Sequence, residues 1–133
     1  MLSAVKDFSP KTKFYFAGSS EMFGKVMQIP QTEKTPFYPR SPYAVAKSTA
    51  YWLVANYRIA YGLFCCTGIL SNHESPLRPN RFVTKKIVKQ VSEIKSGLRD
   101  SLSLGNVNIY RDWGWAPEYV EAMHLMLESS TPD

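Results

Sequence analysis

Tyr43 and Lys47 are the residues of this chain whose types and spacing first suggest chemistry. They lie four positions apart, directly after Ser41 and Pro42, which are typical of the N-cap and first position of a helix. Side chains four apart on a helix project from the same face. Because an ammonium near a phenol favours the phenolate, the spacing predicts that Tyr43 is a general base assisted by Lys47.

The sequence also predicts the helix, strands and loop that would position Tyr43 and Lys47. An alanine-rich stretch predicts a helix over residues 43–61, and Gly62 provides its C-terminal stop. The aromatic run 14–17, which ends at a Gly-Ser-Ser turn, predicts a buried strand before the helix. The apolar run 63–70 predicts a second buried strand after it, and the proline-rich segment 24–40 predicts a long loop.

The second half of the chain repeats this alternation. An apolar stripe predicts a helix over residues 82–95, Leu102 and Leu104 suggest a short strand, and residues 119–127 form a final amphipathic pattern. Residues 72–80 are polar and are expected to form a loop. Alternating strands and helices of this kind predict an α/β fold with a parallel sheet.

Polar side chains follow both predicted strands of the first half. Ser19 and Glu21 come after the first strand, and Asn72 and His73 come after the second. Ligands of parallel sheets bind beyond the carboxyl ends of the strands. We therefore expect these side chains to contribute to the same kind of site as Tyr43.

Composition narrows the function classes. The 133 residues are 44% hydrophobic and 20% charged, which is typical of a globular domain. The formal net charge of +5 fits nucleic-acid binding, an anionic small molecule, or a solvated surface. Because no nucleic-acid-binding motif accompanies the basic residues, and no apolar run could span a membrane, we expect neither nucleic acid nor a membrane as partner. No metal site is expected, and the absence of a secretory signal predicts a cytoplasmic protein.

The two cysteines are adjacent, at positions 65 and 66. Neighbouring side chains of a strand point to opposite faces, so a disulfide between them is not expected. Two half-buried thiols in a reducing cytosol are the preferred interpretation.

Several motifs, taken in order, resemble those of the GDP-mannose 4,6-dehydratases, a family of the extended short-chain dehydrogenase/reductases. The resemblance covers the chain from about residue 12 onward, and the motifs that carry it are Gly18-Ser19-Ser20-Glu21-Met22-Phe23-Gly24, Pro36-Phe37-Tyr38-Pro39-Arg40-Ser41-Pro42-Tyr43, Asn72-His73-Glu74-Ser75-Pro76, Phe82-Val83-Thr84, Ser103-Leu104-Gly105-Asn106 and Arg111-Asp112-Trp113-Gly114. The combination is far more specific than the Tyr/Lys spacing alone.

The resemblance implies a catalytic role for four residues. Tyr43 matches the base at the carbon 4 hydroxyl of the sugar, and Lys47 matches the lysine that holds the nicotinamide ribose. Ser19 occupies the place of the active-site Ser/Thr and would also contact the substrate oxygen. Glu21 matches the glutamate that removes the carbon 5 proton and assists loss of water from carbon 6.

The same resemblance implies binding residues for cofactor and substrate. NADP is the implied cofactor, contacted by Tyr43 and Lys47 and by two residues of the second half, His73 and Arg78. GDP-mannose is the implied substrate, with Asn72, Lys86 and Arg111 near its diphosphate. The implied reaction converts GDP-D-mannose to GDP-4-dehydro-6-deoxy-D-mannose and water, on the route to GDP-fucose, in an enzyme expected to be a homo-oligomer.

One family feature is absent from the sequence. The seven glycines do not form the Gly-x-x-Gly-x-x-Gly turn that meets a cofactor pyrophosphate. The chain is therefore expected to be a single partial domain, residues 1–133, with an incomplete Rossmann-like doubly wound parallel sheet. The chain would then contain the C-terminal half of a dinucleotide-binding domain and part of a substrate domain. The sequence leaves open whether the chain alone binds the cofactor and turns over substrate.

Two other functions stay open from the sequence. One is a different sugar-nucleotide enzyme of the same superfamily, such as an epimerase or reductase. The other is a truncated, non-catalytic nucleotide-binding remnant. A substrate panel distinguishes the first, and an activity and cofactor assay distinguishes the second.

Overall fold

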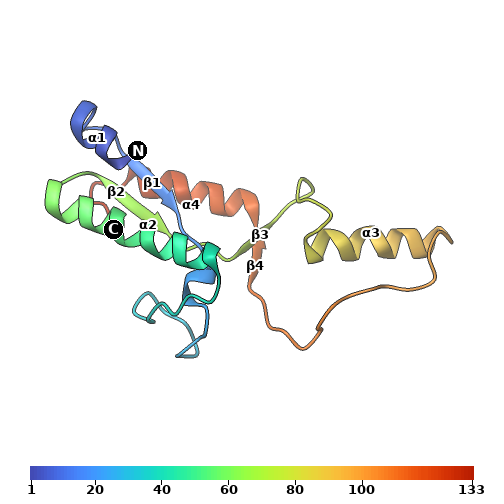
Figure 1. Cartoon of the computed structure of the whole chain (residues 1–133). Helices are drawn as coiled ribbons and strands as arrows, with labels where there is room; N and C mark the ends of the chain where they lie inside the picture. Colours follow the sequence, from blue (N-terminus) through green and yellow to red (C-terminus); the bar gives the residue numbers. More distant parts are fainter. The chain divides into compact units, whose positions relative to one another are not determined.

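The computed structural model describes all residues, 1–133, which group into two compact units. The larger unit comprises Met1–Ser71 and Tyr119–Asp133, and the smaller unit comprises Asn72–Glu118. Each unit contains one parallel pair of strands (Figure 1). The expected α/β fold with parallel strands is confirmed.

The larger unit is built on a β-α-β element. Strand β1 (Phe14–Ala17) and strand β2 (Cys65–Gly68) pair in parallel, with Phe14 opposite Cys65 and Ala17 opposite Gly68. Helix α2 (Pro42–Tyr61) connects them and runs alongside both (Figure 1). The predicted second strand, 63–70, is therefore correct in place but shorter.

Local sequence signals set both ends of α2. The Ser41 hydroxyl accepts a hydrogen bond from the Ala44 amide at 3.1 Å, and Pro42 occupies the first turn, where its missing N–H is not needed. Gly62 ends the helix in the left-handed conformation at φ 64°, where its amide donates to the Arg58 carbonyl.

Three further helical segments belong wholly or mainly to this unit. Helix α1 (Leu2–Phe8) precedes β1 and was not predicted. A single 3₁₀ turn, η1 (Ser20–Phe23), follows β1, and the predicted loop 24–40 then runs to α2 without a helix or strand. Helix α4 (Ala116–Glu128) matches the predicted final helix but begins three residues earlier.

The core of the larger unit lies between α2 and the sheet. Val54 of α2 packs with Leu63 and Cys65, and partly buried side chains of α1 and β1 surround them. Both cysteines are fully buried and free. The predicted absence of a disulfide is therefore confirmed, whereas the thiols are wholly rather than half buried, because each face of β2 is covered.

The smaller unit has less buried surface. Strand β3 (Asn72–Glu74) pairs in parallel with strand β4 (Trp113–Trp115), and helix α3 (Val83–Lys95) lies between them in sequence. The apolar stripe predicted on α3 is present, but its valines are exposed and only Gln90 of this helix is buried.

Two predictions about this unit are wrong. Residues 102–104 do not form a strand. The strand that precedes the final helix, α4, is β4 instead. The segment 72–80 is not wholly a loop, since it begins with β3. None of the helices combines the length with the apolar character that a membrane-spanning segment requires.

Candidate active site

The end of β1 and the turn after it form the first part of the site. Gly18 donates its amide to the Gly68 carbonyl at 2.8 Å, and a Cβ at Gly18 would lie only 2.9 Å from that oxygen. The Ser20 amide donates to the Leu70 carbonyl at 2.8 Å. These contacts fix the chain that carries Ser19 and Glu21 against the end of β2.

Ser19 and Glu21 are arranged by a capping interaction. Ser19 has extended backbone geometry, and its hydroxyl accepts from the Glu21 amide at 3.3 Å as the N-cap of η1. The Glu21 side chain is exposed. The serine hydroxyl and the glutamate therefore occupy one short turn at the carboxyl end of β1.

Lys47 joins α2 to the same strand end. Its ammonium donates to the Ala17 carbonyl at 2.8 Å and lies 5.0 Å from the Phe16 ring centroid. The centroid of the Tyr43 ring is 5.7 Å from the same nitrogen, while the Tyr43 side chain is 53% exposed. The structure thus holds the Lys47 ammonium beside the Tyr43 phenol, at the carbonyl of the residue two positions before Ser19. The phenol remains accessible.

Tyr15 is the other tyrosine close to this region, and its surroundings are unsuited to a base. Its hydroxyl is buried in the larger unit without a hydrogen-bond partner, and a Cβ at Gly68 would collide with it. Burial raises the pKa of the Tyr15 phenol, with a smaller contribution from the Cys66 thiol. Deprotonation of Tyr15 is therefore disfavoured, whereas Tyr43 lies at the surface beside a cation.

The predicted binding residues of the second half all lie in the smaller unit. Asn72 is the first residue of β3, and its amide nitrogen Nδ2 donates to the Asp112 carbonyl at 3.4 Å, beside the Arg111 position. His73 is the central residue of the same strand. Arg111 is exposed, two residues before β4 begins.

Arg78 has a more elaborate environment than the sequence suggested. Its Nε lies 3.3 Å from Oε2 of Glu74, and its guanidinium carbon is 3.5 Å from the Phe82 ring centroid. That Nε is enclosed and is not aligned for a hydrogen bond, so the contact is an ion pair. Sequence reasoning missed Glu74, because an i, i+4 charge pair is predicted only within a helix.

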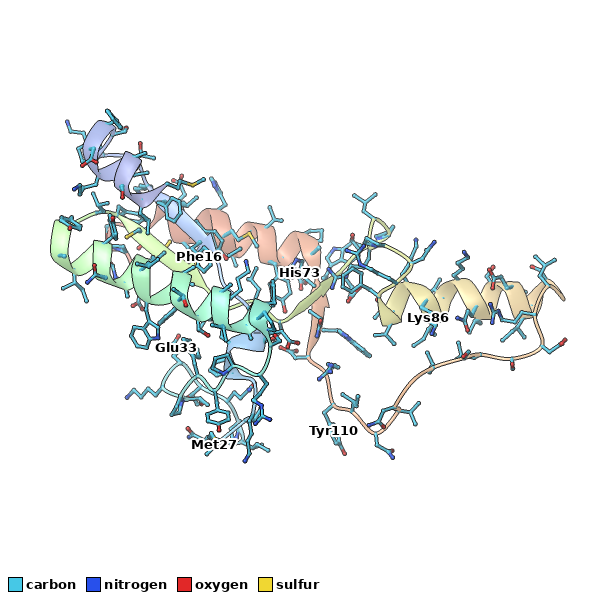
Figure 2. All side chains as sticks on the ribbon, viewed as in Figure 1. Phe16, Met27, Glu33, His73, Lys86 and Tyr110 are labelled. Atoms are coloured by element: carbon cyan, nitrogen blue, oxygen red, sulfur yellow. The ribbon has the colours of Figure 1, made fainter.

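Lys86 projects from α3 (Figure 2) and lines a cavity of about 320 Å³ in the smaller unit. The lining is strongly basic and comprises Asn80, Arg81, Lys86, Lys89, Gln90, Glu93 and Arg99. Four cations against one carboxylate make this cavity suited to an anion.

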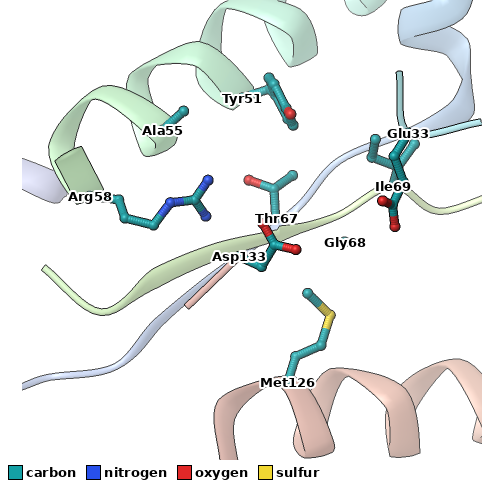
Figure 3. Close-up of a pocket in the computed structure, with 9 residues that line it drawn as sticks. All are labelled: Glu33, Tyr51, Ala55, Arg58, Thr67, Gly68, Ile69, Met126 and Asp133. Carbon is teal, nitrogen blue, oxygen red and sulfur yellow. The ribbon is translucent and has the colours of Figure 1, made fainter. Parts of the chain in front are cut away.

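A cavity of about 350 Å³ in the larger unit contains none of the predicted site residues (Figure 3). Strand β2 passes between α2 and α4 there, with Arg58 on one side and Met126 on the other. The Arg58 side chain donates to the Cys65 carbonyl at 3.2 Å, so its main contact is with the strand.

Solved structures with the same arrangement define the class. The structure described as RMD from Pseudomonas aeruginosa complexed with NADPH has a TM-score of 0.88 and 26% identity, over 98% of this chain and 46% of that chain. The dTDP-glucose 4,6-dehydratase from Bacillus anthracis, in complex with NAD, has a TM-score of 0.85 and 25% identity, over 98% of this chain and 40% of that chain. The fold is that of the short-chain dehydrogenase/reductases, with part of a Rossmann-like parallel sheet.

Sequence comparison narrows the class to one family. The profile described as GDP-mannose 4,6 dehydratase matches residues 1–133, so the chain belongs to this family. The GDP-mannose 4,6 dehydratase of Dictyostelium discoideum is 55% identical over 135 residues, which include 100% of this chain and 38% of that protein. The chain thus spans less than two fifths of the length of this relative.

Proposed function

We propose that this chain carries the acid–base residues of a GDP-mannose 4,6-dehydratase, a lyase that forms GDP-4-dehydro-6-deoxy-D-mannose and water from GDP-D-mannose. The observation that carries the proposal is the ammonium of Lys47, which is fixed at 2.8 Å to the carbonyl of Ala17 beside the exposed phenol of Tyr43. Family membership and 55% identity to a curated enzyme of this name support it.

Tyr43 and Ser19 would act at carbon 4 of the sugar. Tyr43 would take the proton of the carbon 4 hydroxyl as the alcohol becomes a ketone, and the Ser19 hydroxyl would donate a hydrogen bond to the same oxygen. Lys47, already fixed at the strand end, would stabilise the negative charge that develops on the phenol. These roles require one base, one donor and one nearby cation, which the end of β1 and the start of α2 provide.

Glu21 would act after the ketone has formed. The ketone acidifies the proton on carbon 5, and the carboxylate would remove that proton and pass it to the carbon 6 hydroxyl, which departs as water. When carbon 6 regains a hydride, carbon 5 would take up a proton in its turn. Its position two residues beyond Ser19, on the same turn, is suited to reaching the neighbouring carbon. Exposure of the carboxylate in the structure leaves it accessible to a sugar.

The residues present fit a nicotinamide dinucleotide as cofactor, with NADP as the proposed form. Such a group, when bound, would accept the hydride from carbon 4 and return it to carbon 6. Lys47, Tyr43, His73 and Arg78 would hold it, and the guanidinium and ammonium suit its phosphates and ribose. The NADPH and NAD complexes of the similar structures support a cofactor of this class.

The diphosphate of GDP-mannose would bind to the smaller unit. Asn72, Lys86 and Arg111 are the proposed contacts, and the basic cavity at Lys86 supports the assignment. Arginine can hold two phosphate oxygens at once, whereas lysine acts as a point charge.

We also propose that copies of the chain associate through α2. Val45, Trp52 and Ile59 recur every seven residues, which places them on one face of the helix. They are 51%, 63% and 82% exposed, so this apolar face is uncovered within one chain. Association of two such faces would bury it.

An activity assay with a matched variant tests the proposal. The chain is incubated with GDP-mannose and NADP⁺, and the product that has lost one water is measured by mass spectrometry. Tyr43→Phe is expected to abolish product while the variant still binds NADPH, because the ring is kept and only the phenolic group that takes the proton is removed. Turnover by this variant equal to that of the unaltered chain would refute the role of Tyr43.

A substrate panel separates the alternatives. Preference for a UDP- or dTDP-linked sugar over GDP-mannose would indicate another enzyme of the superfamily. Binding of nucleotide without turnover of any substrate would indicate a non-catalytic nucleotide-binding chain.

A further inference from the structure

Glu74 and Arg78 form the centre of a cluster in the smaller unit that also includes Phe82 and Thr84. The guanidinium of Arg78 is restrained on its edge by the Glu74 carboxylate at 3.3 Å and on its face by the Phe82 ring at 3.5 Å. The two charged side chains are only 20% and 17% exposed. Water therefore screens this pair less than it screens an ordinary surface pair.

Glu74 is itself held in place. The Thr84 hydroxyl donates to Oε2 of Glu74 at 2.6 Å, and Oε2 is the same oxygen that faces Arg78. Glu74 is the last residue of β3 and Thr84 the second residue of α3. The short hydrogen bond thus links the strand end to the helix start, on either side of the loop that carries Arg78.

From this geometry we propose that Glu74, held by Thr84, is a positioning residue that orients Arg78 toward a phosphate group of the dinucleotide; this rests on the proposed function, in which Arg78 contacts the cofactor. The ion pair runs through Nε, whereas Nη1 and Nη2 carry four of the five N–H donors. A planar guanidinium that is stacked on Phe82 and has a carboxylate oxygen 3.3 Å from its Nε presents those donors in one direction. A phosphate can then be held by two parallel hydrogen bonds.

Charge alone predicts the opposite effect of removing Glu74. A carboxylate beside Arg78 reduces the local positive potential, so its loss would strengthen binding of any anion if only charge mattered. Positioning predicts weaker binding. We expect Glu74→Gln to reduce the affinity for NADPH about tenfold, since a charge-assisted contact that orients the ligand-binding group is lost.

Thr84 allows the same test without a change of charge. Thr84→Val is expected to weaken NADPH binding about threefold, because Glu74 loses its hydrogen bond, and Thr84→Ser should restore it. Asp7→Asn is the matched control for Glu74→Gln, since it changes the net charge equally in an exposed pair with Lys6 of the larger unit. Its NADPH affinity is expected to equal that of the unaltered chain.

NADPH affinity of each variant is measured by fluorescence titration, and the Arg78 side chain is observed directly by ¹⁵N NMR. In the unaltered chain the Nε–H signal of Arg78 should be sharp and slow to exchange with water, and it should broaden in Glu74→Gln and Thr84→Val but not in Thr84→Ser. Tighter or unchanged binding by Glu74→Gln, or an Nε–H signal unaffected by it, would overturn the inference. If the unaltered chain does not bind NADPH, the cofactor role of Arg78 and the proposed function fail, and the Nε–H signal alone decides whether Glu74 holds Arg78.

Discussion

Removing the hydroxyl of Tyr15 should make the protein more stable. This hydroxyl is buried without a partner in the larger unit, where it faces Gly68. An unpaired buried hydroxyl costs about 1–3 kcal/mol, and replacement by Phe eliminates that cost. The small gap left against Gly68 offsets part of the gain. We expect Tyr15→Phe to increase the free energy of unfolding by about 1 kcal/mol, and the midpoint temperature by about 3 °C.

Tyr57→Phe provides the matched control. The Tyr57 hydroxyl hydrogen-bonds with the Ser3 hydroxyl at 2.8 Å in an exposed position. Its loss should reduce stability by about 0.5 kcal/mol, since one ordinary hydrogen bond is removed. The same chemical change is therefore expected to have opposite signs at the two tyrosines.

Amide hydrogen exchange measures the change in stability in the larger unit, which contains Tyr15. The Gly18 amide donates to the Gly68 carbonyl, so its exchange reports opening of the pairing between β1 and β2. A gain of about 1 kcal/mol should slow that exchange about fivefold. Faster exchange in Tyr15→Phe than in Tyr57→Phe would show that the Tyr15 hydroxyl has a partner and would refute the reasoning.

Further predictions concern the site, the helix cap, the thiols and the exposed helix face. Glu21→Gln should block product formation while the hydrogen on carbon 4 of the sugar still exchanges, as hydride, with labelled cofactor; equal, mild losses of both would contradict its role. Ser41→Ala should lower stability by about 1 kcal/mol in urea unfolding, because the N-cap of α2 is lost, whereas Ser41→Asp should retain it. Burial raises the pKa of both cysteine thiols above about 9, so the stability they contribute is present below that pH and is lost as the pH rises through the raised values; the urea midpoint should fall above pH 9. Trp52→Glu should shift the chain toward monomer in light scattering, and an unchanged mass would contradict association through α2.

Sequence reasoning succeeded where signals are local. Ser41, Pro42 and Gly62 specify the ends of α2 through backbone groups within four residues, so no knowledge of the rest of the fold is needed. The strand at Phe14–Ala17 is similarly marked by its aromatic run and the glycine after it.

Pairing between distant segments explains the errors. Strands β3 and β4 have three residues each and depend on each other across about forty residues, so neither shows a strand pattern alone. Leu102 and Leu104 show such a pattern but have no partner strand, and they remain irregular. A short strand is stabilised by its partner more than by its own composition.

In the candidate site, too, local features could be predicted from the sequence and contacts between distant residues could not. The helical spacing of Tyr43 and Lys47 was readable from the sequence. The Ala17 carbonyl that holds the ammonium lies thirty residues away, and the carboxylate that restrains Arg78 depends on the path of a loop. Both partners require the folded chain, because neither follows from residue spacing.

The hydrogen bond from Lys47 to Ala17 also has an entropic consequence. A free lysine side chain samples many rotamers, and fixing it costs roughly 2 kcal/mol. In this structure the ammonium is already fixed at 2.8 Å by a backbone carbonyl, so folding rather than ligand binding bears that loss. Any ligand that reaches the ammonium meets a preorganised cation, and its affinity is not reduced by the ordering of a flexible side chain.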